Sequence, residues 1–418
     1  MRKAQAYPLY LILRFCLALP AWVVVALYLV RTAKLDPLQL VLMGTVMEAA
    51  VFAFEIPTGI VADLVSRRLS LAIGWLIQGS AWALVAATTD FGVILAAWVL
   101  WGIGATFESG AFQAWITDEV GRENVGPVFV RGTQAGLAGG LVGLAAGIGI
   151  GTVDLRVAII AAGAVTAAMG VVALAVMPET GFTPEPRAGS TRRRAMVDTA
   201  SRGVRLIRRA PALLLLVSAA VFAGAASEGF DRLREAHLLR DIGVPSFLGS
   251  DPLWWFAVIS GVGMILGLVA ATVLRPRVVS PNAARLARLL FVLGALEVAA
   301  GLGFALAGAF AAAIVALWAL GLARSLAYPV YATWLNQSIE DSSVRATVNS
   351  IANQADAIGQ TAGGPLVGVV GRAVSIPAAL TTSALLLTPA LALYGRAIRH
   401  HGTEPELEEL PKPVEAGA

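Results

Sequence analysis

Ionisable side chains interrupt the apolar stretches in the first half of this chain, at Arg14, Glu48, Glu55 and Glu108. A charged group in hydrocarbon is costly, so such residues face protein partners or a water-filled cavity and mark the route of an ion or a proton. Glu48 and Glu55 are seven residues apart and therefore share one face of a helix. Arg14, Glu55 and Glu108 are expected at similar depths, where one arginine cannot neutralise two carboxylates. An acid without a partner could carry a proton, and Glu48 or Glu108 is the first candidate.

The second half carries a similar set, with Glu297, Arg324 and Asp356 inside apolar stretches. Arg324 and Asp356 are expected to pair across a cavity. The charged run from Glu228 to Arg240 falls where an apolar stretch ends, and it is predicted to be a solvated helix end. The alternative role for all the buried charges is a set of fixed ion pairs that hold the helices together without carrying protons.

Aromatic residues accompany these charges. Trp101, Phe107 and Phe112 precede or follow Glu108, and Tyr328 and Tyr331 follow Arg324. Such side chains could line a cavity for an amphipathic organic compound. Packing and the aromatic belts at membrane interfaces explain many of them equally well, so these five are candidates for cavity lining and no more.

Long apolar segments must position these residues. Hydrophobic residues make up 57% of the 418 positions, charged residues make up 14%, and the mean hydropathy is +0.76, values that exclude a soluble domain. Crossing a bilayer takes about 20 apolar residues, and the runs here lack the alternation of membrane-barrel strands. The sequence predicts an all-α integral membrane protein with about twelve spans. Their centres are expected near Ala21, Ala50, Ser80, Val99, Leu141, Thr166, Val221, Gly263, Leu296, Leu317, Gly359 and Leu385.

The loops between these segments predict the topology. If the N-terminus is cytoplasmic, the inner loops carry roughly three times as many Lys and Arg residues as the outer loops, which places both termini inside. The basic residues that decide this are Arg192, Arg193, Arg194, Arg205, Arg208, Arg209, Arg275 and Arg277. Anionic lipid on the inner leaflet accounts for the net charge of +4, so no nucleic-acid partner is required. The preference for Arg over Lys, with abundant Ala, Gly and Val, indicates a bacterial cytoplasmic membrane.

The chain divides near its middle. Residues 1–177 and 211–398 form two predicted six-helix halves, joined by a polar, Arg-rich connector over 178–210 and followed by an acidic tail over 399–418. The halves echo each other, because the small-residue run at 138–143 in the fifth span resembles that at 362–368 in the eleventh. Internal duplication of this kind is common among transporters. No cofactor is expected, and the three histidines and single cysteine lack the spacing of a metal site.

The loop between the second and third spans reads E-I-P-T-G-I-V-A-D-L-V-S-R-R-L-S from Glu55. Gly59, Asp63, Arg67 and Arg68 resemble the G-x-x-x-D-x-x-G-R-R signature of the major facilitator superfamily at the same position, with Ser66 in place of the second glycine. The resemblance implies that family's fold of two pseudo-symmetric six-helix halves. It also implies that these four residues form a conformational latch, associated in the family with the outward-open state.

Other family signatures are incomplete. The fourth span reads W-V-L-W-G-I-G over 98–104 without the arginine associated with proton coupling, and the glycine-rich run over 136–151 lacks the proline of the antiporter signature. The similarity is closest to the drug-efflux-like branch, which implies export. A G-P-rich pattern in the eleventh span, around Pro365, is compatible with that direction.

The predicted function is secondary active transport by alternating access, as proton-coupled export of small amphipathic or drug-like molecules. The alternatives are proton-coupled uptake of a nutrient or metabolite and, more remotely, an intramembrane enzyme that acts on lipid. An enzyme is not favoured, because no catalytic arrangement stands out and no nucleotide-binding phosphate loop is present. The expected partners are a small-molecule substrate, protons and membrane lipids, and the expected state is a monomer.

Overall fold

The computed structural model describes residues 3–20, 22–182, 201–278, 282–339 and 344–401, and no β-strand forms within these ranges. The connector expected over 178–210 is therefore described only at its two ends, and the tail over 399–418 lies mostly outside the described residues. The elements are α1 Lys3–Ala18, α2 Trp22–Arg31, α3 Pro37–Leu64, α4 Arg67–Ala87, α5 Phe91–Glu108, α6 Ala111–Val120, α7 Val125–Gly151, α8 Leu155–Val176, α10 Pro211–His237, the π-helical turn η1 Leu238–Ile242, α11 Trp254–Val278, α12 Ala283–Ala305, α13 Phe310–Gln337, α14 Arg345–Ala373, α15 Ile376–Leu386 and α16 Thr388–His401.

Ten helical segments among the described residues are long and apolar enough to cross a membrane. Two further helices, α11 and α14, complete the bundle. The apolar part of α11, residues 254–270, is shorter than these ten segments. The helix α14 is long enough, with 29 residues, but it includes polar side chains such as Asn349, Asp356 and Gln360. The prediction of an all-α membrane protein with about twelve spans is confirmed.

Two of the spans in the first half are each broken into two helices. The first span changes from α1 to α2 around Leu19 and Pro20. The fourth changes from α5 to α6 at Ser109 and Gly110, where Gly110 adopts a φ of 71° that glycine reaches without strain. The break leaves Glu108 as the last residue of α5.

Glycine-mediated helix contacts recur at equivalent places in the two groups of helices. In the first group, Gly139 and Gly143 of α7 face the backbone of Phe15 in α1 and of Leu19 just after it, where no Cβ would fit. In the second group, Gly359 and Gly363 of α14 face the backbone of α10 around Val221 and Ala225 in the same way. Small residues allow membrane helices to approach this closely. The sequence similarity between the fifth and eleventh spans thus corresponds to close packing of a glycine-containing helix against the first helix of each half.

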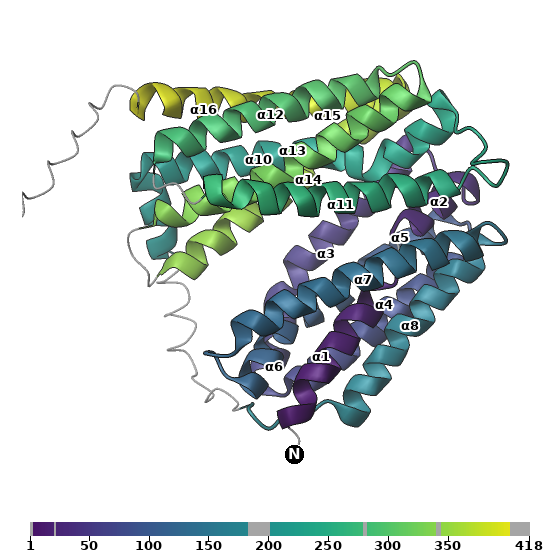
Figure 1. Cartoon of the computed structure of the whole chain (residues 1–418), viewed down its shortest axis with the longest axis vertical. Helices are drawn as coiled ribbons and strands as arrows, with labels where there is room; N and C mark the ends of the chain where they lie inside the picture. The colour runs from purple at the N-terminus through teal and green to yellow at the C-terminus, as the bar shows by residue number, and fades with distance from the viewer. Residues whose placement is uncertain (1–2, 21, 183–200, 279–281, 340–343, 402–418) are drawn as a thin grey trace, which may run out of the picture.

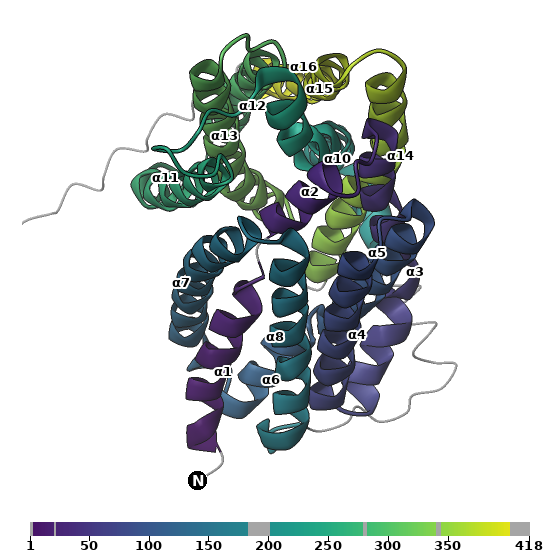
Figure 2. The ribbon, with the colours of Figure 1, turned by 90° about the vertical axis from the view of Figure 1, so that its right-hand side faces the viewer.

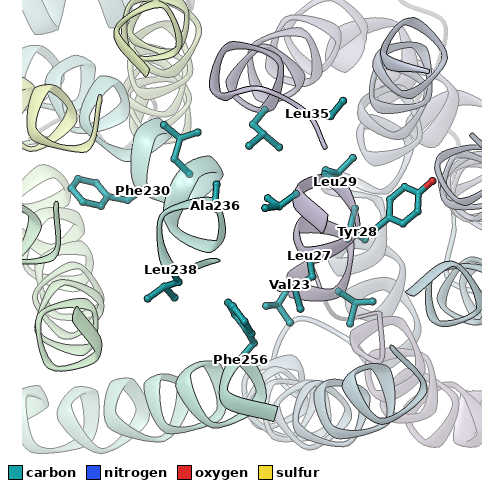
Figure 3. Close-up of a cluster of buried hydrophobic side chains, with 14 of the residues drawn as sticks. Val23, Leu27, Tyr28, Leu29, Leu35, Phe230, Ala236, Leu238 and Phe256 are labelled. Atoms are coloured by element: carbon teal, nitrogen blue, oxygen red, sulfur yellow. The ribbon is translucent and has the colours of Figure 1, made fainter. Parts of the chain in front are cut away.

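Among the described residues, the buried apolar contact between the two halves lies at one end of the bundle. One buried apolar cluster combines α2, α3 and α5 with α10, α11 and α13, and Figure 3 shows the side chains of α2 and α10 facing each other there. Two further clusters each draw on one half alone, over 6–177 and 207–397. The helices correspondingly converge at one end of the molecule and diverge at the other (Figure 1). The first is called the closed end, and the second, which carries the loop between α3 and α4, is called the motif end.

Polar contacts fasten the closed end. The Arg240 guanidinium donates to the carbonyl oxygens of Leu35 (2.8 Å) and Val30 (3.4 Å), at the turn between α2 and α3. Two ion pairs at longer range also join the halves, from Arg31 to Asp251 at 4.0 Å and from Arg372 to Asp36 at 3.9 Å. Figure 2 shows α2 inserted next to α10 at this end.

Candidate functional site: a charged cavity beside the contact between the halves

Half of the charged run on α10 is buried, at Glu228, Glu235 and His237, which corrects the prediction of a solvated helix end. Glu228, Glu235 and His237 are only 1%, 2% and 1% exposed. The His237 ring bonds the carbonyl oxygen of Phe304 at 3.1 Å and the carboxylate of Asp241 at 2.9 Å. The helix does not end in water here, because the rest of α10 and η1 pack under α2 at the closed end. The run therefore lies inside the contact between the halves.

Glu228 and Arg232 form the centre of that contact. They are one helical turn apart on α10, with 3.6 Å between Nε and Oε2. The Arg232 guanidinium lies over the ring of Trp98 on α5, with its carbon 5.2 Å from the ring centroid. Gly44 of α3 makes room for both, since a Cβ there would lie 2.5 Å from Arg232 Nε and from Glu228 Oε2. One arginine thus interacts with both halves.

A second network lies within the C-terminal half. Arg324 of α13 donates from Nε to Glu297 of α12 at 2.8 Å and from Nη1 to Asp231 of α10 at 3.0 Å. The predicted pair between Arg324 and Asp356 is not formed; Asp356 instead accepts a hydrogen bond of 2.7 Å from Gln360, one turn along α14. The correction has a simple cause: two other acids are closer to Arg324, and sequence alone gave no distances between helices.

A cavity of about 390 Å³ adjoins these charges. It lies between α10, α11 and α13, with Asp231, Arg234, Glu235 and Arg324 as its charged lining and Phe230, Phe256, Met264 and Trp318 among its apolar lining. A smaller cavity of about 60 Å³ lies between the halves. The two cavities share Asp231, Arg234 and Glu235.

Carboxylates outnumber guanidiniums in this region. Glu48 of α3 lies within electrostatic range of Arg232 and of Asp356, which adds one acid to those already described. The acids are Glu48, Glu228, Asp231, Glu235, Glu297 and Asp356, against Arg232, Arg234 and Arg324. Arg234 is already paired with its neighbour Glu235, with 2.6 Å between Nε and Oε1. The site can therefore accept positive charge, either as protons or as a cationic ligand.

The first-half charges form a separate group within the N-terminal half. Glu55 accepts a hydrogen bond of 2.7 Å from Ser109, the residue after Glu108. Gln78 donates to Glu108 at 3.4 Å, and Arg14 lies within electrostatic range of Glu108. The structure thus brings Arg14, Glu55 and Glu108 into one neighbourhood, as the similar depths predicted, while Glu48 faces the C-terminal half.

The predicted cavity aromatics are scattered. Trp101 packs in a cluster with Trp22 and Trp82, at centroid distances of 4.7 and 6.0 Å. Phe112 is 2% exposed and packs inside the N-terminal half. Tyr331 donates to the carbonyl oxygen of Leu216 at 3.4 Å. The cavities described above draw none of their lining from the five predicted aromatics, which are Trp101, Phe107, Phe112, Tyr328 and Tyr331.

The signature loop is tied to its own half. Ser66 caps α4 by accepting from the Leu69 amide at 3.0 Å and donates to Glu179 at 2.7 Å, so the residue that departs from the signature has a structural role. Arg67 pairs with Asp118 at the end of α6, and Arg68 lies 4.0 Å from Glu179.

Gly59 and Asp63 make no such contacts. A Cβ on Gly59 would meet nothing within 4 Å. Asp63 is exposed, and within the described part of the chain no hydrogen bond or ion pair is found for it.

The sequence reasoning missed Arg234, Glu235 and Trp22, which line the cavities. Arg234 and Glu235 belong to the run already set aside as solvated. A sequence signal was present, since Glu228, Asp231, Arg232 and Glu235 recur at spacings of three and four residues and so share one helix face. No cluster of three or more metal-binding side chains occurs among the residues described.

The comparisons with known proteins agree with this geometry. A family model described as Major Facilitator Superfamily matches residues 8–299. The chain belongs to the major facilitator superfamily. This superfamily member is 22% identical over 376 residues to YxaM, an uncharacterised MFS-type transporter of Bacillus subtilis strain 168, with 90% of each chain covered.

Solved structures show the same fold. A bacterial homologue of the human lysosomal transporter Spinster, in an inward-facing and unoccupied conformation, matches with a TM-score of 0.73 and 14% identity over 95% of this chain and 97% of that one. The nucleoside transporter NupG matches with a TM-score of 0.73 and 15% identity over 95% and 98%. The chain is thus a multi-pass membrane transporter of the superfamily type.

Proposed function

We propose that this chain is a proton-coupled exporter of small amphipathic molecules that works by alternating access, with the motif end at the cytoplasm. The observation that carries the proposal is the excess of carboxylates over guanidiniums in and around the cavities, where Glu48, Glu297 and Asp356 lie near mid-length of their helices. Sites of this kind lie near the bilayer midplane in transporters built from two repeats. In this assignment the structure is the inward-open state, and both termini are cytoplasmic.

Glu228 is the proposed proton carrier. It is 1% exposed, and its Oε2 is buried without a hydrogen-bond partner. A buried carboxylate that loses its counter-charge is stable only as the neutral acid. When the closed end separates, Arg232 moves away from Trp98 and Gly44, and Glu228 gains access to water. Proton binding and release are thereby linked to which end is open.

The signature loop supplies the proposed latch. Asp63 and Gly59 face open space at the motif end in this state, while Arg67 and Arg68 are held by Asp118 and Glu179. When the motif end closes, we expect Asp63 to meet helix ends of the other half and hold that end shut. Glu108, with Arg14 nearby, is a second acid that could exchange a proton, further from the contact between the halves.

The proposed direction of transport is export. The alternative is uptake, and the solved relatives include a nucleoside transporter, NupG. The excess of acids supports a cationic or proton-exchanged cargo in either direction. The fold and the family favour transport over catalysis, so lipid-directed enzymatic activity is not proposed.

Liposomes with a trapped pH dye test the coupling. We expect a panel of lipophilic cations and neutral drugs to evoke proton movement with the parent chain. Glu228→Gln should abolish that movement, because the amide cannot exchange a proton, with a loss of at least about 100-fold in coupled flux. Glu123→Gln, which changes an exposed loop acid, is the matched control and should behave as the parent. Substrate flux without proton movement in the parent would overturn the coupling.

A further inference from the structure

Glu228 and Arg232 form a buried ion pair without a hydrogen bond between their closest atoms. Their closest atoms are 3.6 Å apart, which is too long for a hydrogen bond. Glu228 Oε2 and Arg232 Nε are both buried without a hydrogen-bond partner. Leaving such atoms unpaired is costly, so a better donor for Glu228 would compete effectively with Arg232.

A second carboxylate near this ion pair, on the same helix, also has an unpaired oxygen. Glu235 is bonded through Oε1 to Arg234, but its Oε2 is buried without a partner, and its side chain is only 3% exposed. Glu235, Arg232 and Trp98 all line the cavity of about 60 Å³ between the halves. A ligand could reach that space from the larger cavity, since Asp231, Arg234 and Glu235 line both.

The wall of this space opposite the acids is aromatic. Trp22 and Trp98 line it from the N-terminal half, with their ring centroids 5.7 Å apart. Trp98 already holds one cation against its face, the guanidinium of Arg232. Tryptophan is the side chain that attracts cations most strongly in this way. Trp98 Nε1 is also buried without a partner and could donate to an acceptor on a ligand.

These features select one class of ligand. The two unpaired carboxylate oxygens need N–H donors, and the aromatic wall favours a flat or compact cation. A guanidinium or primary ammonium group supplies both the charge and the donors. A quaternary ammonium group supplies the charge alone, and a urea supplies the donors without the charge.

We propose that Arg232 is a built-in competitor for an organic cation that carries N–H donors, and that such cations are the substrate class of this chain. The inference rests on the proposed function of these cavities as the transport site. A bound cation takes the place of the guanidinium between Glu228 and Trp98 and frees Arg232 from α5. Because that arginine joins the halves at the closed end, its release favours opening of that end.

Equilibrium binding to the purified full chain in nanodiscs tests the ligand class without requiring transport. The probe is radiolabelled 2-phenylethylguanidinium, with 2-phenylethylurea and 2-phenylethyltrimethylammonium as competitors of nearly equal size. We expect the guanidinium to bind at least about tenfold more tightly than either competitor. Equal affinity for the guanidinium and the trimethylammonium compound would overturn the requirement for donors, and absence of guanidinium binding would overturn the whole inference.

Arg232→Gln tests the competition. Its removal should raise guanidinium affinity by about tenfold, the factor for a competitor that occupies the site nine-tenths of the time, and should leave urea affinity unchanged. Glu228→Gln should weaken guanidinium binding by a similar factor. Arg240→Gln is the matched control, because it also loosens the closed end but does not line the cavity, so it should shift all three affinities alike. Weaker guanidinium binding in a folded Arg232→Gln would show a merely structural arginine.

The outcomes separate the two proposals. If the guanidinium binds with the expected selectivity but no flux occurs in liposomes, the proposed function is wrong and the proposed ligand class is supported. If only neutral drugs give flux and proton movement, and the guanidinium does not bind, the proposed function is supported and the proposed ligand class is wrong. If Arg232→Gln does not fold, the three-compound comparison on the parent chain still decides the inference.

Discussion

Gly359→Leu is expected to leave no folded protein after detergent extraction. A Cβ at this position would run into the carbonyl group of Val221 and would lie 3.0 Å from the Ala225 amide nitrogen. These are backbone atoms of α10, which cannot move aside as a flexible side chain can. Overpacking a core costs about 1–3 kcal/mol when side chains yield, and here the helices themselves must separate, so the loss should exceed about 4 kcal/mol.

Gly303→Leu is the matched control for this prediction. Gly303 lies within α12, is exposed, and would place a Cβ 3.6 Å from the Ala316 side chain, an ordinary contact. Heating followed by size-exclusion chromatography gives the apparent Tm of each variant. A Gly359→Leu peak that melts within about 2 °C of the parent would show that α10 and α14 do not pack as described.

The second large effect is expected at Arg324. This guanidinium serves two acids at once, and the Glu297 side chain is only 15% exposed while that of Asp231 is 49% exposed. Arg324→Gln leaves Glu297 as a buried charge without a partner, which costs about 3–5 kcal/mol. The better solvated Asp231 should contribute little of that loss.

A second substitution distinguishes the effect of the unpaired charge on thermal stability from the effect of lost packing. Glu297→Gln combined with Arg324→Gln removes both members of the buried pair and should restore most of the lost thermal stability, because an amide pair can hydrogen-bond without a charge. Arg285→Gln, at an exposed arginine on α12, is the control and should leave the Tm unchanged. A double variant as unstable as Arg324→Gln alone would indicate that the arginine acts through packing.

The sequence predicted the fold more fully than the site. Apolar runs of membrane length and the signature from Gly59 to Arg68 were sufficient for twelve spans and the superfamily. The small-residue runs at 138–143 and 362–368 indicated an internal duplication, and the structure adds that glycines in both helices pack against the backbone of a neighbouring helix. The similar depths of Arg14, Glu55 and Glu108 followed from counting residues along helices.

The site depends on distances between helices, which residue counts do not supply. Arg324 pairs with Glu297 and Asp231 rather than with Asp356 because of how α10, α12 and α13 are arranged around it. Half of the charged run on α10 is buried because α2 packs against α10 and η1, and Arg240 of η1 bonds a segment some 200 positions away in the sequence. The helical spacing of the run was visible in the sequence, but spacing alone does not distinguish a solvated face from one covered by another helix.

The central claim is that the two ends of the bundle open in turn. Distances between spin labels measure this directly in a Cys16→Ser background, with one pair of cysteines at Val153 and Leu248 near the closed end and another at Val65 and Val204 near the motif end, all exposed positions. Addition of a transported compound should lengthen the first distance and shorten the second. If both distances change in the same direction, or neither changes while flux continues, alternating access about this contact is wrong.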